Sequence, residues 1–281
     1  MFESEKPRTH SYHAEATALK ADLEQPLRQT ITPQAAIALP ETGGYHSQRL
    51  HTYRAGEVLT FGSAHTQVGG NEETKKPEHG WTTLATAVVE NINILDVLTA
   101  DRVVSQISTD HPKQGYVPTI SFLGTRFENL RIAGHPVHLE LNLNIFGQRS
   151  EGDVPYTKNH EFLACVDRQY KQLKDFDDLP ADVAARYKEV SEDASGEKGL
   201  ECSLVNKAEG AYPGQSFGHV IHVPNFGTIY LATVRLLQHE FEKNVPKKTT
   251  FELTMIEVDM GCIGSGKVGV ASTRTNGGSK P

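Results

Sequence analysis

Two short glycine motifs in the sequence raise the question of catalysis. Residues 214–218 spell G-x-S-x-G, the motif in which a hydrolase serine is lifted out of a strand–turn–helix beside an oxyanion hole. Here the residues after Ser216 read as a strand that ends at Pro224, and no Asp or Glu stands between Ser216 and His239. Because a hydrolase of this type needs an acid and then a histidine after the serine, we interpret residues 214–218 as a glycine turn.

The second motif, G-x-x-x-x-G-K at residues 261–267, matches the start of a phosphate-binding loop. Val268 stands where such a loop needs a Ser or Thr to bind Mg²⁺. The residues that follow are rich in valine and glycine, so they do not favour the helix whose N-terminus would bind phosphate. The pattern favours a hairpin turn, and we expect no nucleotide or other cofactor.

The thirteen histidines are numerous enough for a metal site to be considered. His160 and His239 each precede a Glu, but neither has a second histidine four residues on, so the zinc-protease pattern is absent. Other histidines recur three residues apart, and on a strand such pairs face opposite sides unless the chain bends between them. Each histidine alone is more simply explained as a surface or hydrogen-bonded residue. The candidate metal ligands, which lie at or beside expected turns, are His111, His135, His138, His219 and His222.

Charge and composition argue against several classes of function. The net charge of −7 and the absence of Lys/Arg clusters argue against nucleic-acid binding, which needs a basic face. No apolar stretch approaches the ~18 residues that a transmembrane helix requires. The N-terminus shows no basic leader followed by an apolar run, so the expected location is the cytoplasm. Export without an N-terminal signature, or a surface location, stays open as the alternative.

Alternation of apolar and polar residues is the strongest structural signal in the chain. Residues 139–145 alternate without interruption, and residues 251–260 do so with a change of phase between Met255 and Ile256. Such a change predicts a bulge or a bend from one sheet to another. Further strands are expected at residues 57–61, 82–94, 101–108, 119–123, 127–132, 219–223 and 228–236. The sequence therefore predicts an all-β protein, an antiparallel sandwich or a barrel-like domain.

One segment has helical periodicity instead. Residues 159–175 place apolar side chains on one helix face, with Asn159 as a suitable N-cap. A second helix is expected to start near Pro180 and to bury Val183 and Tyr187. We expect a helical hairpin inserted at residues 147–199 of one β-rich domain, whose first part is residues 1–146 and whose completing strands are residues 200–281. Residues 14–23 fit a helix by composition and a strand by alternation, and both readings stay open.

Five stretches together resemble, in order and turn placement, the choice-of-anchor P group of bacterial, mostly actinobacterial, surface proteins. They are residues 89–109, 127–137, 226–231, 249–260 and 266–275. The resemblance extends over residues 10–146 and 216–276 and leaves the helical insertion outside it. It implies an all-β extracellular or envelope-associated domain without catalytic residues, and it favours a strand at residues 14–23. The chain departs from the group by its insertion and by its lack of a leader peptide.

These observations favour a non-enzymatic structural or interaction protein that self-associates through β-rich surfaces, with a second copy of itself as partner. The extended segment before Pro40 could add as a strand to a neighbouring subunit. The alternative is an enzyme or a binder of small molecules or metals whose pocket lies in the mouth of the barrel and uses histidines.

The hydrolase motif can be tested directly. Because Ser216 has no acid and histidine in the required order, we expect no labelling of the protein by a fluorophosphonate probe. Gel fluorescence of the wild type and of Ser216→Ala measures this. Labelling that disappears in the variant would establish Ser216 as an activated nucleophile.

Overall fold

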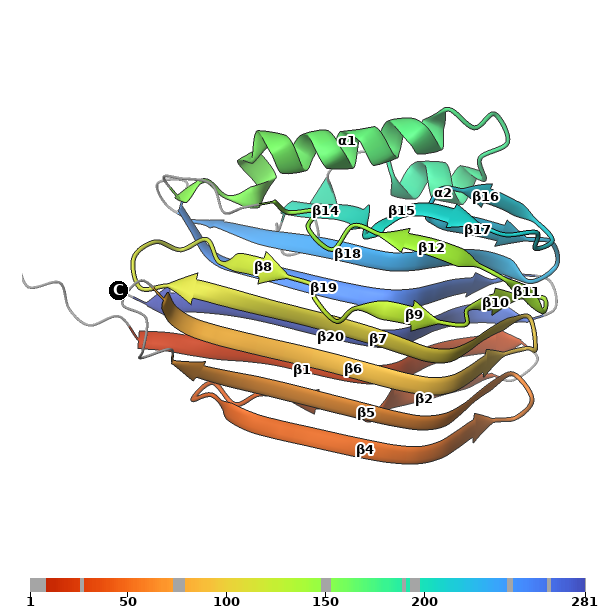
Figure 1. The fold of residues 1–281 in the computed structure, drawn as a ribbon, viewed down its shortest axis with the longest axis horizontal. Helices are drawn as coiled ribbons and strands as arrows, with labels where there is room; N and C mark the ends of the chain where they lie inside the picture. Colours follow the sequence, from red (N-terminus) through yellow and green to blue (C-terminus); the bar gives the residue numbers. More distant parts are fainter. Residues whose placement is uncertain are drawn as a thin grey trace, which may run out of the picture.

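The computed structural model describes residues 9–25, 28–72, 79–147, 153–188, 191–192, 198–241, 245–261 and 264–280. Within these residues two antiparallel sheets stack as the layers of a β-sandwich, and the long strands of both layers run in nearly the same direction (Figure 1). The expectation of an all-β antiparallel fold is confirmed, and of the two architectures left open the sandwich is observed.

The ten-stranded sheet contains strands from both ends of the chain. Its main path runs β13-β14-β18-β19-β20-β1-β2, with β3, β16 and β17 attached to it. β1 therefore lies between β20 and β2, near one edge of the path. The strands are β1 Thr9–Gln25, β2 Gln29–Gln34, β3 Ile37–Ala38, β13 Ser191–Glu192, β14 Lys198–Ser203, β16 Gln215–Phe217, β17 Val220–Val223, β18 Gly227–Phe241, β19 Val245–Met260 and β20 Ser265–Lys280.

The eight-stranded sheet is formed by the middle of the first half of the chain. Its main path runs β11-β10-β7-β6-β5-β4, and the short β8 and β9 pair with β7. Its strands are β4 Gly44–Ala55, β5 Leu59–Glu72, β6 His79–Ile94, β7 Leu98–Pro112, β8 Thr119–Ser121, β9 Arg126–Glu128, β10 Arg131–Ile132 and β11 His135–Pro136. A separate two-stranded sheet pairs β12 His138–Leu141 with β15 Val205–Glu209.

Two helices lie between residues 147 and 199, after a short 3-10 turn, η2 Tyr156–Lys158. α1, His160–Lys174, is capped as the sequence predicts, because the side chain of Asn159 accepts hydrogen bonds from the backbone N–H groups of residues 161 and 162. α2, Ala181–Arg186, follows it and buries Val183, while Tyr187 is buried directly after the helix. Figure 1 shows α1 running along the edge of the sandwich beside β14.

None of the helices in the described part of the chain has the length and apolar character needed to cross a membrane.

In the ten-stranded sheet the side chains change face along one row of residues, at the predicted change of phase. We call this row the crease. Met255 and Ile256 are both fully buried, and the pairing of β18 with β19 steps from Leu231–Ile256 to Thr233–Thr254. Ala232, in the same row, has φ +47°, and Ala271 of β20 has φ +50°. Each strand thus reverses the faces of its side chains and stays in the same sheet. The predicted change of phase is confirmed by the burial of both residues. The predicted passage to another sheet is wrong, and the pairing of β18 with β19 keeps its register through this row, so no bulge is found there.

The eight-stranded sheet has a matching irregularity. Asn91 of β6 has φ +54°, and it lies between the paired positions Glu90 and Ile92. Gly62 of β5 stands beside it, where an added Cβ would lie 2.9 Å from the side-chain nitrogen of Asn91. Glycine suits this position because any larger residue would press on the side chain of Asn91, which would have to shift.

The strand expected at residues 139–145 is shorter in the structure. β12 ends at Leu141, and residues 143–146 form a turn in which the side chain of Asn142 accepts a hydrogen bond from the backbone of Asn144. Asparagine side chains favour such turns because they bond to their own backbone. Ile145 and Phe146 at the end of this turn are buried, and Phe146 stacks on Phe162 of α1 with ring centroids 4.3 Å apart.

The main strand of the N-terminal segment is paired on both sides within the chain. Residues 14–23 are strand, as the resemblance implied, and β1 pairs with β20 from Thr9–Lys280 to Gln25–Ser265. Both long edges of β1 are occupied within the chain, since its other edge pairs with β2 and β3. β1 therefore has no free edge to add to a neighbouring subunit, whereas residues 1–8 lie outside the described part of the chain and addition through the rest of the segment before Pro40 stays a prediction. Deleting residues 1–40 would remove a strand with a buried face.

The crease generates a prediction about stability. Ala271→Val introduces a β-branched residue at φ +50° in a fully buried position. Left-handed strain and overpacking together should lower the free energy of unfolding by about 3 kcal/mol, measured by urea denaturation. Ala271→Gly is the control and should cost much less, because glycine adopts this conformation freely. Equal stability of Ala271→Val and the wild type would contradict the crease.

Candidate interaction surfaces

The five histidines considered as metal ligands lie in different environments. His111 is buried on β7, and His135 and His138 are exposed on β11 and β12. His219 is buried in the turn before β17, and His222 on β17 has its Nδ1 3.2 Å from Thr228 Oγ1. Across the described ranges, no three His, Cys, Asp or Glu side chains lie close enough to hold a metal ion.

The structure instead brings His111 beside His10, a residue that the sequence did not single out. Their ring centroids are 4.8 Å apart, and His10 also stacks on Trp81 at 5.0 Å. Burial, followed by the influence of His13, lowers the pKa of His10 to about 4. Burial, followed by the influence of His10, lowers the pKa of His111 to about 3. Both imidazoles are therefore neutral at pH 7, and the alternation of His10 with Tyr12 was the signal for its inward position.

A half-buried ion-pair network joins α2 to the outer face of the ten-stranded sheet. The guanidinium of Arg186 donates to Glu201 at 2.5 Å and to both carboxylate oxygens of Glu257, at 2.9 and 3.1 Å. Arg235 donates to the same two carboxylates at 2.9 and 2.8 Å. Arg186 also lies over the ring of Tyr230, 3.9 Å from its centroid. Two cations and two anions thus meet in one cluster.

The charges of this network hold its four side chains together. We call the group of Arg186, Arg235, Glu201 and Glu257 the clamp. Burial alone would raise the pKa of Glu257, but hydrogen bonds from Arg186 and the charge of Arg235 lower it below its usual value. Glu257 therefore stays ionised, and its oxygens are already engaged by both guanidinium groups. A carboxylate held in this way is poorly suited to general acid–base catalysis, which needs a pKa near the working pH.

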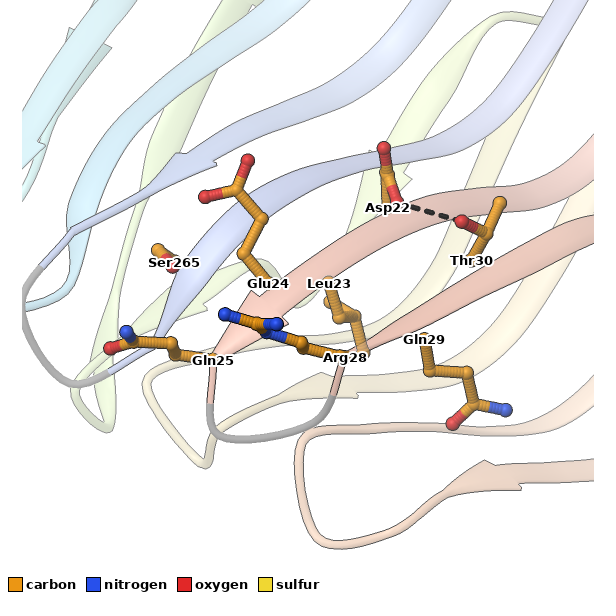
Figure 2. Close-up of a pocket in the computed structure, with 8 residues that line it drawn as sticks. All are labelled: Asp22, Leu23, Glu24, Gln25, Arg28, Gln29, Thr30 and Ser265. Carbon is orange, nitrogen blue, oxygen red and sulfur yellow. Dashed lines mark hydrogen bonds between the residues drawn. The ribbon is translucent and has the colours of Figure 1, made fainter.

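Two hollows adjoin on the outer face of the same sheet, each with a volume of about 480 Å³. The first lies at the end of the β1–β2 hairpin, where Figure 2 shows Asp22 and Glu24 projecting from β1 and Arg28 extending toward the end of that strand. The second lies over Gly269 and is bounded by Arg235 and Glu257 of the clamp. Both are lined by Asp22 and Thr30, so they adjoin at these residues, and the two hollows together are called the cleft below.

The strand β4 forms a free edge of the eight-stranded sheet. It pairs with β5 on one side, and no described strand pairs with its other side. Nearly all of its residues are exposed, although side chains above and below a sandwich strand are normally covered on one face. Tyr45 is 64% exposed, and Leu50 and Tyr53 are half-buried against the core.

Comparison with known proteins places the chain in a family. Residues 10–237 match the family described as Domain of unknown function (DUF8256), which is most of the chain. The chain belongs to the DUF8256 family. In this DUF8256 protein the matched segment includes the eight-stranded sheet, both helices and most of β18, and it ends before β19 and β20. No curated protein and no solved structure gives a significant match.

The buried histidines predict how the stability of the DUF8256 protein depends on pH. The pKa of His111 is about 3 when folded and 6.5 in its usual range, so between these values the unfolded chain binds more protons. Stability from this residue is complete above pH 6.5 and is lost as the pH falls toward 3. Between pH 7.5 and 5.0 the loss should be about 2 kcal/mol.

Urea denaturation of the wild type and of His111→Gln at these two pH values measures the loss. The variant should show a decrease smaller by about 2 kcal/mol, because glutamine does not titrate. His135→Gln is the matched control, since His135 is exposed, and it should behave as the wild type. An identical decrease in all three proteins would contradict the burial of His111 in a neutral form.

Proposed function

We propose that this DUF8256 protein is a non-enzymatic interaction protein that self-associates by pairing β4 with the β4 strand of a second copy. The observation that carries the proposal is the free edge of β4, twelve residues long and exposed on both faces. An unpaired edge presents a row of backbone N–H and C=O groups that another strand can bond.

Other sheet edges in the described ranges are short or covered. β13 has two residues, and β2 has six with Pro33 among them. The side of β7 away from β6 is occupied by β8, β9 and β10. By contrast, β4 contains no Pro, Lys, Asp or Glu, the residues with which natural edge strands commonly prevent pairing. This difference supports β4 as the docking edge.

A two-fold axis normal to the sheet gives a plausible register. Such an axis pairs residues that face the same side, and centring it on Leu50 sets this half-buried side chain against its counterpart in the second copy. The same register sets Arg49 opposite His51 of the second copy. Contact between the two Leu50 side chains would extend the apolar interior across the junction.

Charge opposes this pairing only weakly. Arg49 and Arg54 are the charged residues of β4, and Arg54 forms an ion pair with Glu57 of its own chain. The remaining repulsion involves exposed charges, which salt screens over about 8 Å at physiological ionic strength. A non-catalytic role is also what the resemblance to the choice-of-anchor P group implies.

The variant Leu50→Lys tests the proposal. It sets two ammonium groups against each other at the centre of the junction, so it should convert a dimer into a monomer. Light scattering coupled to size-exclusion chromatography at tens of micromolar gives the mass, and circular dichroism verifies the fold. Gln29→Lys on the β2 edge is the matched control and should remain a dimer. A monomeric wild type, or a dimeric Leu50→Lys, would refute pairing through β4.

A further inference from the structure

We propose that the cleft on the outer face of the ten-stranded sheet, formed by the two adjoining hollows, binds a saccharide of two or more sugar rings. This inference is independent of self-association, because the cleft lies on a different sheet from β4. Each hollow has a volume of about 480 Å³. Each falls within the range of ~300–1,000 Å³ that is typical of small-molecule sites.

Local irregularities of the sheet create the second hollow. β2 is paired with β1 at Leu19–Gln34 and at Ala21–Ile31, so Thr32 and Pro33 together stand opposite Lys20 alone. This bulge sets Pro33 as a wall of the hollow. The floor is Gly269, which contributes no side chain, and the opposite wall is the Arg235–Glu257 pair of the clamp.

The charges around the cleft alternate in sign. Along one row of the sheet, Asp259 of β19 pairs with Lys267 of β20, which in turn pairs with Asp22 of β1. Asp22 accepts a hydrogen bond of 2.9 Å from Thr30 Oγ1 on β2. A ligand of a single charge would meet repulsion from half of these groups. A hydroxyl group both donates and accepts, so a polyhydroxylated ligand can bond to both kinds.

The lysines at the cleft are free to change partner. Lys267 Nζ lies 3.4 Å from Asp259, and its side chain is 74% exposed. Lys20 Nζ lies 3.9 Å from Glu252, with a side chain 54% exposed. Exposed pairs with this geometry contribute little to stability, so a ligand hydroxyl can replace either contact at small cost.

The first hollow adds uncharged and planar polar groups of the kind that recognise sugar hydroxyls. Gln25, Gln29 and Arg28 line it together with Glu24 and Ser265 (Figure 2). The second hollow adds the carbon surface that the C–H faces of a sugar ring require. That surface consists of Pro33 and the methyl group of Thr254 beside Gly269. The two hollows thus differ in polarity and adjoin at Asp22.

Saturation-transfer NMR with the full-length protein tests the proposal. The probes are maltose, cellobiose, xylobiose, chitobiose and their tetramers. Each is used at about 5 mM, a concentration on the order of the Kd of a weak site. At least one should bind, and Gly269→Val should weaken its binding at least tenfold. A Cβ at Gly269 would lie 3.4 Å from the flexible end of Lys20, so the variant can fold.

Gly69→Val is the matched control, because Gly69 lies on the eight-stranded sheet and an added Cβ would lie 3.7 Å from Tyr45. It should bind as the wild type. A second variant, Asp22→Ala, removes one of the two side chains shared by both hollows and should also weaken binding. The inference is overturned if no probe binds, or if binding survives both Gly269→Val and Asp22→Ala. The β4 test is read from the mass of the protein and the cleft test from saccharide binding. Failure of one proposal can therefore be told from failure of the other.

Discussion

The pairing of β1 with β20 is the contact on which the rest of the sandwich depends. It joins the two ends of the chain over almost the whole length of both strands. β19 and β18 are then added beside β20, and β2 beside β1, so the sheet that carries the cleft cannot be complete until the C-terminal strands are in place. Such a contact between distant segments has a high loop-closure cost, and the burial of the inner faces must offset it.

Because of the crease, one long strand can bury alternate side chains on one side of the row and the opposite set on the other side. At Ala18, Ala232, Met255 and Ala271 the side chains change face within one row, and all four are fully buried. Small residues suit this row because two of them adopt positive φ in the interior. Beyond the crease, Ser105 of the opposite sheet lies 2.7 Å from Thr273, so a polar contact joins the two layers inside the sandwich.

The helical segment covers only part of the outer face of the ten-stranded sheet. α2 covers the β14–β18 side through Arg186, whose charge is matched by Glu201 and Glu257. Removing one partner would leave an uncompensated buried charge, which is why such networks position an element firmly even where they add little net stability. On the β20–β1–β2 side no described helix covers the sheet, and there the bulge at Thr32–Pro33 and Gly269, which has no side chain of its own, shape the cleft.

Local patterns in the sequence determined the element types, because alternation and capping depend on near neighbours. They predicted the β-rich class, the cap at Asn159 and the change of phase at Met255. They failed at residues 142–145, where Asn142 turns the chain. The spacing of the histidine candidates held no information on which strands meet. Only the tertiary structure set His10 beside His111, grouped Arg186 with Glu201, Arg235 and Glu257, and left β4 at an edge. Strand order and register decide these contacts, and they arise from pairings between segments that lie far apart in the chain.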